Sequence, residues 1–159
     1  MQDDSRGPNL RIPPPILFVV PLLTGFLVQH FVRIRIVNDL DAERILRAVG
    51  WVEIAIALAL CWWAITTFRR LQTPVIPHSR ARTLAQEGPY KISRNPIYLG
   101  FAVLYVGIAL AANALWPLVF LPEALVLAYL FAIKPEEEYL TREFGDSYRD
   151  YCSRVRRWI

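Results

Sequence analysis

The sequence at residues 88–100 reads GPYKISRNPIYLG, a polar, rigid and basic stretch that opens directly into a long apolar run. Its Gly-Pro step marks a turn. Asn95 followed by Pro96 is typical of a helix N-cap with proline at the first helical position. Arg94 stands just outside this predicted helix start. An arginine beside a helix N-terminus is suited to an anion, so we expect an anion site here.

Long apolar runs dominate the rest of the chain. Of the 159 residues, 55% are hydrophobic and 20% are charged, whereas soluble domains carry about 25% charged residues. Four runs, at about 12–32, 49–68, 96–115 and 116–133, are long enough or nearly so to cross a bilayer core of about 30 Å. The sequence therefore predicts an all-α, polytopic membrane helical bundle of about four transmembrane helices with a C-terminal amphipathic cytoplasmic helix.

The distribution of charge predicts how the bundle is oriented. Basic residues gather in segments 69–95 and 134–159, whereas segment 33–48 balances its arginines with acids. By the positive-inside rule, both termini and the long central loop are cytoplasmic. We therefore expect a single integral membrane domain over 1–159, in a prokaryotic inner membrane. It comprises a transmembrane hairpin at 12–68, a cytoplasmic loop at 69–95, a second hairpin at 96–133 and a cytoplasmic tail at 134–159.

Three shorter features refine this plan. Residues 38–47 are amphipathic, and we expect them to lie on the outer membrane surface as a separate piece before a helix that starts at Trp51. The second hairpin should turn near 112–117. In the tail, Tyr148, Tyr151 and Val155 recur at helical spacing, which predicts a helix folded against the cytoplasmic face of the bundle.

A second polar cluster, Glu136-Glu137-Glu138, follows the fourth run. The hairpin should bring it beside Arg94, because the cytoplasmic ends of the two arms are neighbours. Taken singly, each feature also has a structural explanation, such as a helix cap, first-turn acids favoured by the helix dipole, or a lipid-phosphate contact. Together they offer a cation and free amides for a carboxylate, acids for an amino group or ribose hydroxyls, and aromatic surface for a base. S-adenosylmethionine is a molecule that matches all of these groups, and its sulfonium also suits aromatic faces.

Two motifs in the C-terminal half carry a resemblance to a known group of enzymes. The stretch at 88–100 is followed by Glu-Glu-x-x-Leu-x-x-x-Phe-Gly-x-x-Tyr-x-x-Tyr, which begins at Glu136. This pair resembles the isoprenylcysteine carboxyl methyltransferase and phospholipid methyltransferase superfamily over about residues 73–158. The resemblance implies a helical membrane bundle that holds S-adenosylmethionine at its cytoplasmic face.

Carried over by position, the resemblance implies a set of cofactor-binding residues. Together with Arg94, which we assign from its own chemistry, and the turn residue Gly88, the predicted set is His78, Arg82, Leu84, Gly88, Tyr90, Arg94, Asn95, Pro96, Ile97, Tyr98, Glu136 and Glu137. Of these, Arg94, Glu136 and Glu137 are the predicted catalytic residues, and no metal site is expected.

The chain departs from the prenyl-cysteine enzymes at two positions. Those enzymes have histidine where this chain has Asn95, although asparagine still offers a hydrogen bond. They also have an arginine ahead of the acidic pair, where this chain has Ala132. This second departure puts a prenyl-cysteine substrate in doubt, so the acceptor class stays open between an isoprenylcysteine-like carboxylate, a phospholipid amine and a thiol.

Methyl transfer at a sulfonium carbon needs positioning and exclusion of water more than a protein nucleophile. An amine acceptor also needs a base, for which Glu136, Glu137 and His78 are candidates. Two alternatives remain: an NADPH-dependent sterol- or steroid-type membrane reductase, and a non-catalytic lipid-binding protein. The expected partners are a lipophilic or small acceptor and membrane lipids, not nucleic acid, and the oligomeric state is open.

Overall fold

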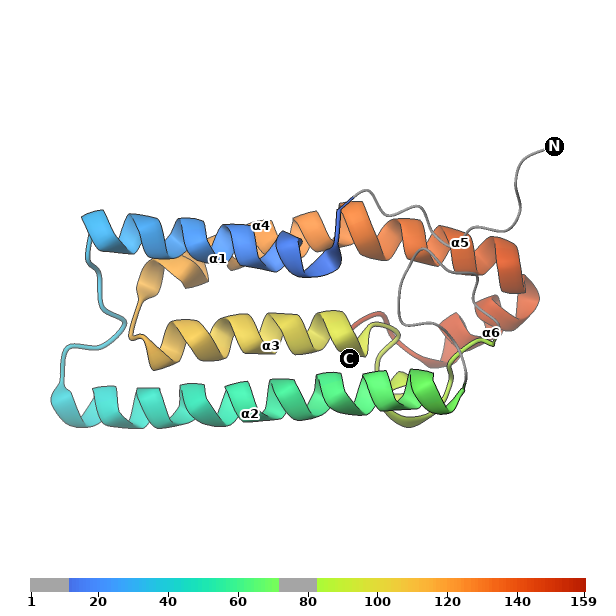
Figure 1. The fold of residues 1–159 in the computed structure, drawn as a ribbon, viewed down its shortest axis with the longest axis horizontal. Helices are drawn as coiled ribbons and strands as arrows, with labels where there is room; N and C mark the ends of the chain where they lie inside the picture. The colour runs from blue at the N-terminus through green and yellow to red at the C-terminus, as the bar shows by residue number, and fades with distance from the viewer. Residues whose placement is uncertain (1–11, 72–82) are drawn as a thin grey trace.

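The computed structural model describes residues 12–71 and 83–159, and within these ranges every regular element is helical. The first two long helices are α1 (Pro14–Phe31) and α2 (Leu40–Arg70), and a short 3-10 turn η1 (Gly88–Lys91) precedes α3 (Pro96–Ala111). Next, α4 (Leu115–Ala128) passes through a π-helical turn η2 (Tyr129–Ile133) into α5 (Lys134–Phe144), and α6 (Asp146–Arg154) ends the chain's helices (Figure 1). The predicted all-α architecture is confirmed.

Three of these helical stretches are long and apolar enough to cross a membrane: Pro14–Phe31, Leu40–Arg70 and Leu115–Phe144. The fourth apolar helix, α3, has only 16 residues, which corresponds to about 24 Å at 1.5 Å per residue. The prediction of a helical membrane bundle is therefore confirmed, with α3 shorter than a full span.

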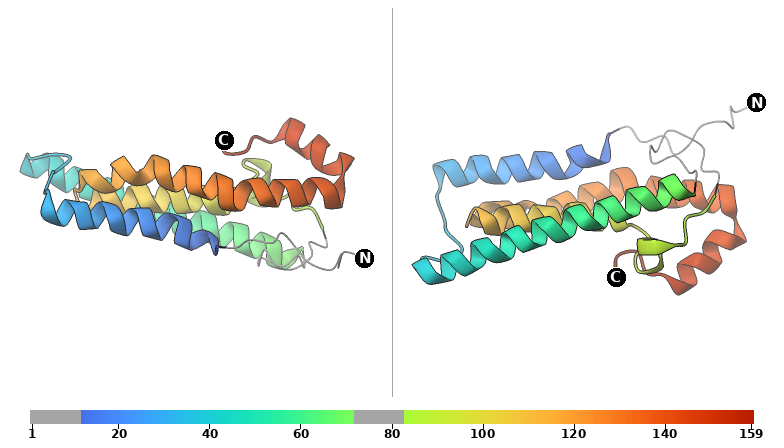
Figure 2. Two further views of the ribbon diagram at one scale, coloured as in Figure 1. Left: turned by 90° about the horizontal axis from the view of Figure 1, so that it is seen from above. Right: turned by 60° about the horizontal axis from the view of Figure 1, so that its bottom comes forward.

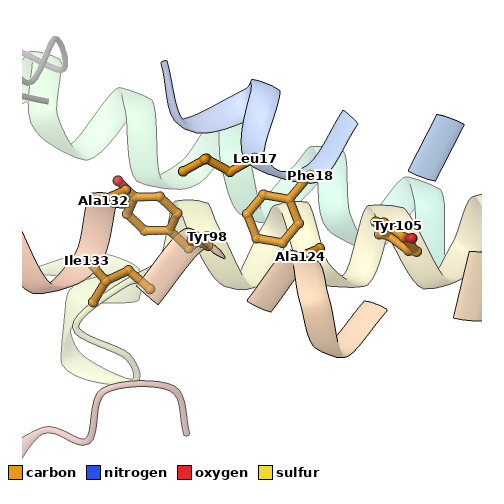
Figure 3. Packing of buried hydrophobic residues seen from close by; sticks show 8 residues of the cluster. Leu17, Phe18, Tyr98, Tyr105, Ala124, Ala132 and Ile133 are labelled. Carbon is orange, nitrogen blue, oxygen red and sulfur yellow. The ribbon is translucent and has the colours of Figure 1, made fainter. Parts of the chain in front are cut away.

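The helices are arranged as two packed pairs joined through α3. Helix α2 runs alongside α3, and α1 runs alongside α4 (Figures 1 and 2). Helix α3 also packs against α4 and α1, so it connects the two pairs. Figure 3 shows the core between α1, α3 and α4, where Phe18 lies close to Tyr98 and Ala124, and Tyr105 lies further along α3. This arrangement places the start of α3 at the centre of one end of the bundle.

Helices α2 and α3 approach so closely that their backbones touch at Gly50. A Cβ atom added to Gly50 would lie 2.5 Å from the backbone nitrogen of Ala111 and 2.6 Å from the carbonyl oxygen of Gly107. Small residues at helix crossings permit such close packing in membranes. Because the obstructing atoms are backbone atoms of another helix, no side-chain rotation can make room.

We expect Gly50→Leu to lower the free energy of unfolding by about 3 kcal/mol, since the overpacked side chain must push α2 from α3. Thermal unfolding followed by circular dichroism in mild detergent measures the effect. Ala48→Leu, at an exposed position of the same helix, is the matched control and should change stability little. Equal stability of the two variants would contradict the observed helix contact.

The separate amphipathic piece expected at 38–47 is wrong. Helix α2 begins at Leu40 and continues without interruption to Arg70. The side chain of Asp39 caps it by accepting hydrogen bonds from the amides of Asp41 and Ala42 at 3.1 and 2.9 Å. No proline breaks this stretch, and Gly50 is buried against α3, so the helix passes straight through.

The turn between α3 and α4 lies where the sequence predicts it, between Ala111 and Leu115. Asn113 adopts a positive φ of 49° there. Its side chain accepts hydrogen bonds from the amides of Ile36 and Val37 at 3.0 and 3.1 Å and donates to the carbonyl oxygen of Val37 at 2.9 Å. Asn113 therefore ties the connection between α1 and α2 to the turn of the second hairpin.

The fourth helix does not end at its last apolar residue, Ile133. It continues as the polar helix α5, which projects beyond the apolar, membrane-spanning part. The π-helical turn occurs where Pro135 lacks the amide that an α-helix would need to bond the carbonyl of residue 131. Gly145, with φ of 52°, then reverses the chain into α6. The tail thereby folds back toward the start of α3 (Figure 2).

Candidate functional site

The 3-10 turn at Gly88–Lys91 fastens the approach to α3 onto the neighbouring helices. Gly88 has φ of 57°, and a Cβ there would lie 2.7 Å from Oγ1 of Thr67 on α2, so glycine is required both for conformation and for space. The centroid of the buried Tyr90 ring lies 4.8 Å from the centroid of the Phe68 ring. The hydroxyl of Tyr151 on α6 donates to the carbonyl oxygen of Tyr90 at 2.7 Å. These contacts fix Tyr90 between α2 and the tail.

The predicted start of α3 is confirmed at Pro96, but the predicted side-chain cap is wrong. Asn95 occupies the N-cap position and makes no capping hydrogen bond. Its side-chain amide donates instead to the carbonyl oxygen of Arg157 at 3.1 Å. The C-terminal segment thus turns the Asn95 amide away from the helix, and the first-turn amides of α3 receive no bond from this side chain.

Arg94 and Glu137 meet between α3 and α5. Nη1 of Arg94 lies 3.3 Å from Oε1 of Glu137, and it also donates to Sγ of Cys152 on α6 at 2.7 Å. Arg157 holds the same carboxylate through two parallel bonds, Nε to Oε1 at 2.9 Å and Nη2 to Oε2 at 2.8 Å. Glu137 is therefore neutralised by two arginines, one from the segment before α3 and one from the C-terminal segment.

One donor of this cluster is left over. Nε of Arg94 is buried and has no hydrogen-bond partner among the described residues. The Arg94 side chain as a whole is also largely buried, at 15% exposed. A buried donor without a partner loses its hydration without compensation, which costs about 1–3 kcal/mol or more for a charged group. Such a donor is explained if an anion binds beside it.

Glu136 directly precedes Glu137 in the first turn of α5 but has a different environment. Its Oε1 accepts a hydrogen bond from the hydroxyl of Tyr98 at 2.7 Å. Burial raises the pKa of Glu136 to about 7, the Tyr98 hydrogen bond acts to lower it, and the charge of Glu137 adds to the rise. Near neutral pH this carboxyl group can therefore either hold a cation or accept a proton.

The hairpin prediction is thus reflected in the contacts, since residues from the two predicted clusters are hydrogen-bonded or ion-paired. Leu84, another member of the predicted set, is only half-buried. Glu138, which follows the two predicted site glutamates, is exposed at the helix surface. His78 and Arg82 lie outside the described residues. Among the described residues, no group of three or more His, Cys, Asp and Glu side chains could hold a metal ion.

Arg157 and Cys152 are members of the site that the sequence did not predict. Arg157 was only one of several tail arginines, yet it bonds Glu137 and lies over the Tyr129 ring, with its guanidinium carbon 5.1 Å from the centroid. Cys152 follows the buried Tyr151 directly. The helical spacing of the buried tyrosines Tyr148 and Tyr151 was a usable signal, because it indicates that one face of the tail packs against the rest of the protein.

Comparison with known proteins supplies the family. A family model described as phospholipid methyltransferase matches residues 45–147, a range that includes α3, α5, the stretch at 88–100 and the second motif as far as Gly145. No curated protein matches the chain. The match extends over well over half of the 159 residues. The chain belongs to the phospholipid methyltransferase family, within the membrane isoprenylcysteine and phospholipid methyltransferase superfamily.

Proposed function

We propose that this membrane methyltransferase uses S-adenosylmethionine and transfers its methyl group to an acceptor that arrives from the bilayer. Family membership already indicates a membrane methyltransferase in general, and the donor and acceptor are our proposal. The observation that supports the donor most directly is the buried Nε of Arg94, which lacks a partner among the described residues. It lies at the start of α3, where Asn95 makes no capping bond.

The residues present fit the polar groups of S-adenosylmethionine. The free donor of Arg94 and the first-turn amides of α3 suit its carboxylate. Glu136 suits its ammonium group or its ribose hydroxyls. Tyr90 and Tyr98 offer aromatic surface for the sulfonium and the adenine. When bound, the cofactor supplies an electrophilic methyl group.

The protein's own contribution is orientation, exclusion of water and proton handling. The Tyr98 hydroxyl holds one oxygen of Glu136 at 2.7 Å, and the other oxygen can accept a proton from an amine acceptor. A thiolate or carboxylate acceptor would not need this base. Tyr98 also belongs to the apolar core shared with Leu17 and Phe18 of α1 (Figure 3). The polar site therefore adjoins the apolar core of the bundle, which favours a lipophilic acceptor. We place the site on the cytoplasmic side.

Isothermal titration calorimetry in lipid nanodiscs tests the donor. We expect S-adenosylmethionine and S-adenosylhomocysteine to bind with a stoichiometry of one per chain, while NADPH does not bind. Binding of NADPH with no response to either S-adenosyl compound would overturn the proposal in favour of a reductase.

Transfer of labelled methyl from S-adenosylmethionine tests the acceptor. Parallel reactions contain a total lipid extract, an amine-bearing phospholipid, a prenyl-cysteine analogue and a panel of small thiols. We expect label in the lipid extract and in the amine-bearing phospholipid. Label only in the thiols would contradict a lipophilic acceptor, and no label in any arm would overturn transferase activity.

A further inference from the structure

The last residues of the chain lie across the start of α3, and we infer that Arg157 is a positioning residue that keeps the Nε donor of Arg94 free for the cofactor's carboxylate. The inference rests on the proposed use of S-adenosylmethionine. It assigns to the C-terminal segment 155–159 a role in donor recognition rather than a purely structural one.

The main chain of this segment is bonded to the residues that lead into α3. The carbonyl oxygen of Arg156 accepts a hydrogen bond from the amide of Arg94 at 3.0 Å. The carbonyl oxygen of Arg157 accepts two more, from Oγ of Ser93 at 3.2 Å and from Nδ2 of Asn95 at 3.1 Å. Arg157 therefore enters the site with its backbone already fixed.

The side chain of Arg157 is fixed as well. Its guanidinium takes both oxygens of Glu137, at 2.9 and 2.8 Å, and its carbon lies 5.1 Å from the centroid of the Tyr129 ring. A planar guanidinium is the group best matched to this paired contact, and a lysine cannot reproduce it. The pKa of Arg157 is raised mainly by its hydrogen bond to Glu137, so Arg157 stays positively charged throughout the working pH range.

This arrangement decides what Arg94 can bind. Glu137 is only 18% exposed, so its carboxylate needs a charged partner. With Arg157 in place, Arg94 contacts Glu137 only through Nη1, at 3.3 Å. The same Nη1 also donates to Sγ of Cys152, and Nε of Arg94 has no partner among the described residues. Without Arg157, the nearest cation is Arg94, and its guanidinium would turn to pair with both oxygens. The Nε donor would then be consumed by Glu137.

A double-mutant cycle with Arg157→Gln and Glu137→Gln tests this coupling by equilibrium binding. The two probes are S-adenosylhomocysteine and methylthioadenosine, which lacks the amino-acid carboxylate. The measured quantity is the ratio of their dissociation constants. We expect Arg157→Gln to reduce the preference for S-adenosylhomocysteine about tenfold, the value of one charge-assisted hydrogen bond, with the affinity for methylthioadenosine unchanged.

The Glu137→Gln background supplies the decisive comparison. Once residue 137 carries no charge, nothing captures Arg94, so adding Arg157→Gln to Glu137→Gln should leave the preference unchanged. A tail that acted only as a structural support would weaken both probes equally in both backgrounds, and that result would overturn the inference. Arg156→Gln, an exposed neighbour with the same loss of charge, is the matched control and should behave as the unmodified protein.

Two further outcomes keep the inference separate from the proposed function. If the unmodified protein binds neither probe, both the proposed function and this inference are overturned. If it binds both probes with a clear preference and Arg157→Gln retains that preference, only the inference falls. Should Arg157→Gln fail to fold, Arg157→Lys keeps the charge but loses the paired contact, and we expect it to lose about half of the logarithmic preference.

Discussion

Replacing Arg94 with alanine is expected to weaken the binding of S-adenosylhomocysteine about a hundredfold, because charged hydrogen bonds to a carboxylate contribute about 1.5–3 kcal/mol. The bundle should remain folded. The hydrogen bond from Arg94 to the carbonyl oxygen of Arg156 is made by the main-chain amide, and Glu137 keeps both of its bonds to Arg157. The variant therefore removes the free donor without leaving a buried carboxylate unpaired.

Three comparisons make the Arg94 result specific. Lys91→Ala removes the same charge from an exposed position three residues away and should bind normally. Arg94→Lys keeps a positive charge without an Nε donor and should recover only part of the affinity. Methylthioadenosine should bind Arg94→Ala as well as it binds the unmodified protein. Undiminished binding of S-adenosylhomocysteine by Arg94→Ala, measured by calorimetry, would remove the carboxylate assignment.

Much of the site could be predicted from sequence because its two halves are each local. Neighbouring residues alone predict that α3 begins at Pro96. They also predict that a polar segment with three acids follows Lys134-Pro135. The length of the apolar runs then gives a hairpin, and a hairpin brings its two ends together. The contacts of Arg94 with Glu137 at 3.3 Å and of Tyr98 with Glu136 at 2.7 Å follow from that reasoning.

The parts that could not be predicted depend on contacts between distant segments. Asn95 has every local property of a helix cap, yet a carbonyl 62 residues away competes for its side chain. The role of Arg157 depends on the tail docking against α3, and no local pattern distinguishes it from the exposed Arg156. Similarly, the continuity of α2 depends on Gly50 being covered by α3, because an unpacked glycine would weaken a helix there.

The pH dependence of methyl transfer is expected to report the ionisation of Glu136. Its pKa lies near 7 because burial disfavours the charged form, so only the deprotonated carboxylate, which gains population as pH rises from 6 to 8, can accept a proton from an amine acceptor. With an amine-bearing phospholipid, kcat/KM should rise about tenfold per pH unit below pH 7 and level off above it. Glu136→Gln should lower kcat/KM at pH 8 about a hundredfold or more and abolish the rise, because general-base catalysis contributes at least that much.

Stability and a second variant provide independent evidence for the same group. Because the pKa of Glu136 is raised from its ordinary value near 4.5, the folded state binds the proton more tightly than the unfolded state. The associated stability is therefore complete below pH 4.5 and is lost as pH rises to about 7, and Glu136→Gln should remove this dependence from thermal unfolding curves. Tyr98→Phe deletes the hydrogen bond that lowers the pKa, so it should move the rising limb of kcat/KM to higher pH. A limb that stays in place in both Tyr98→Phe and Glu136→Gln would assign the proton acceptor to a different residue.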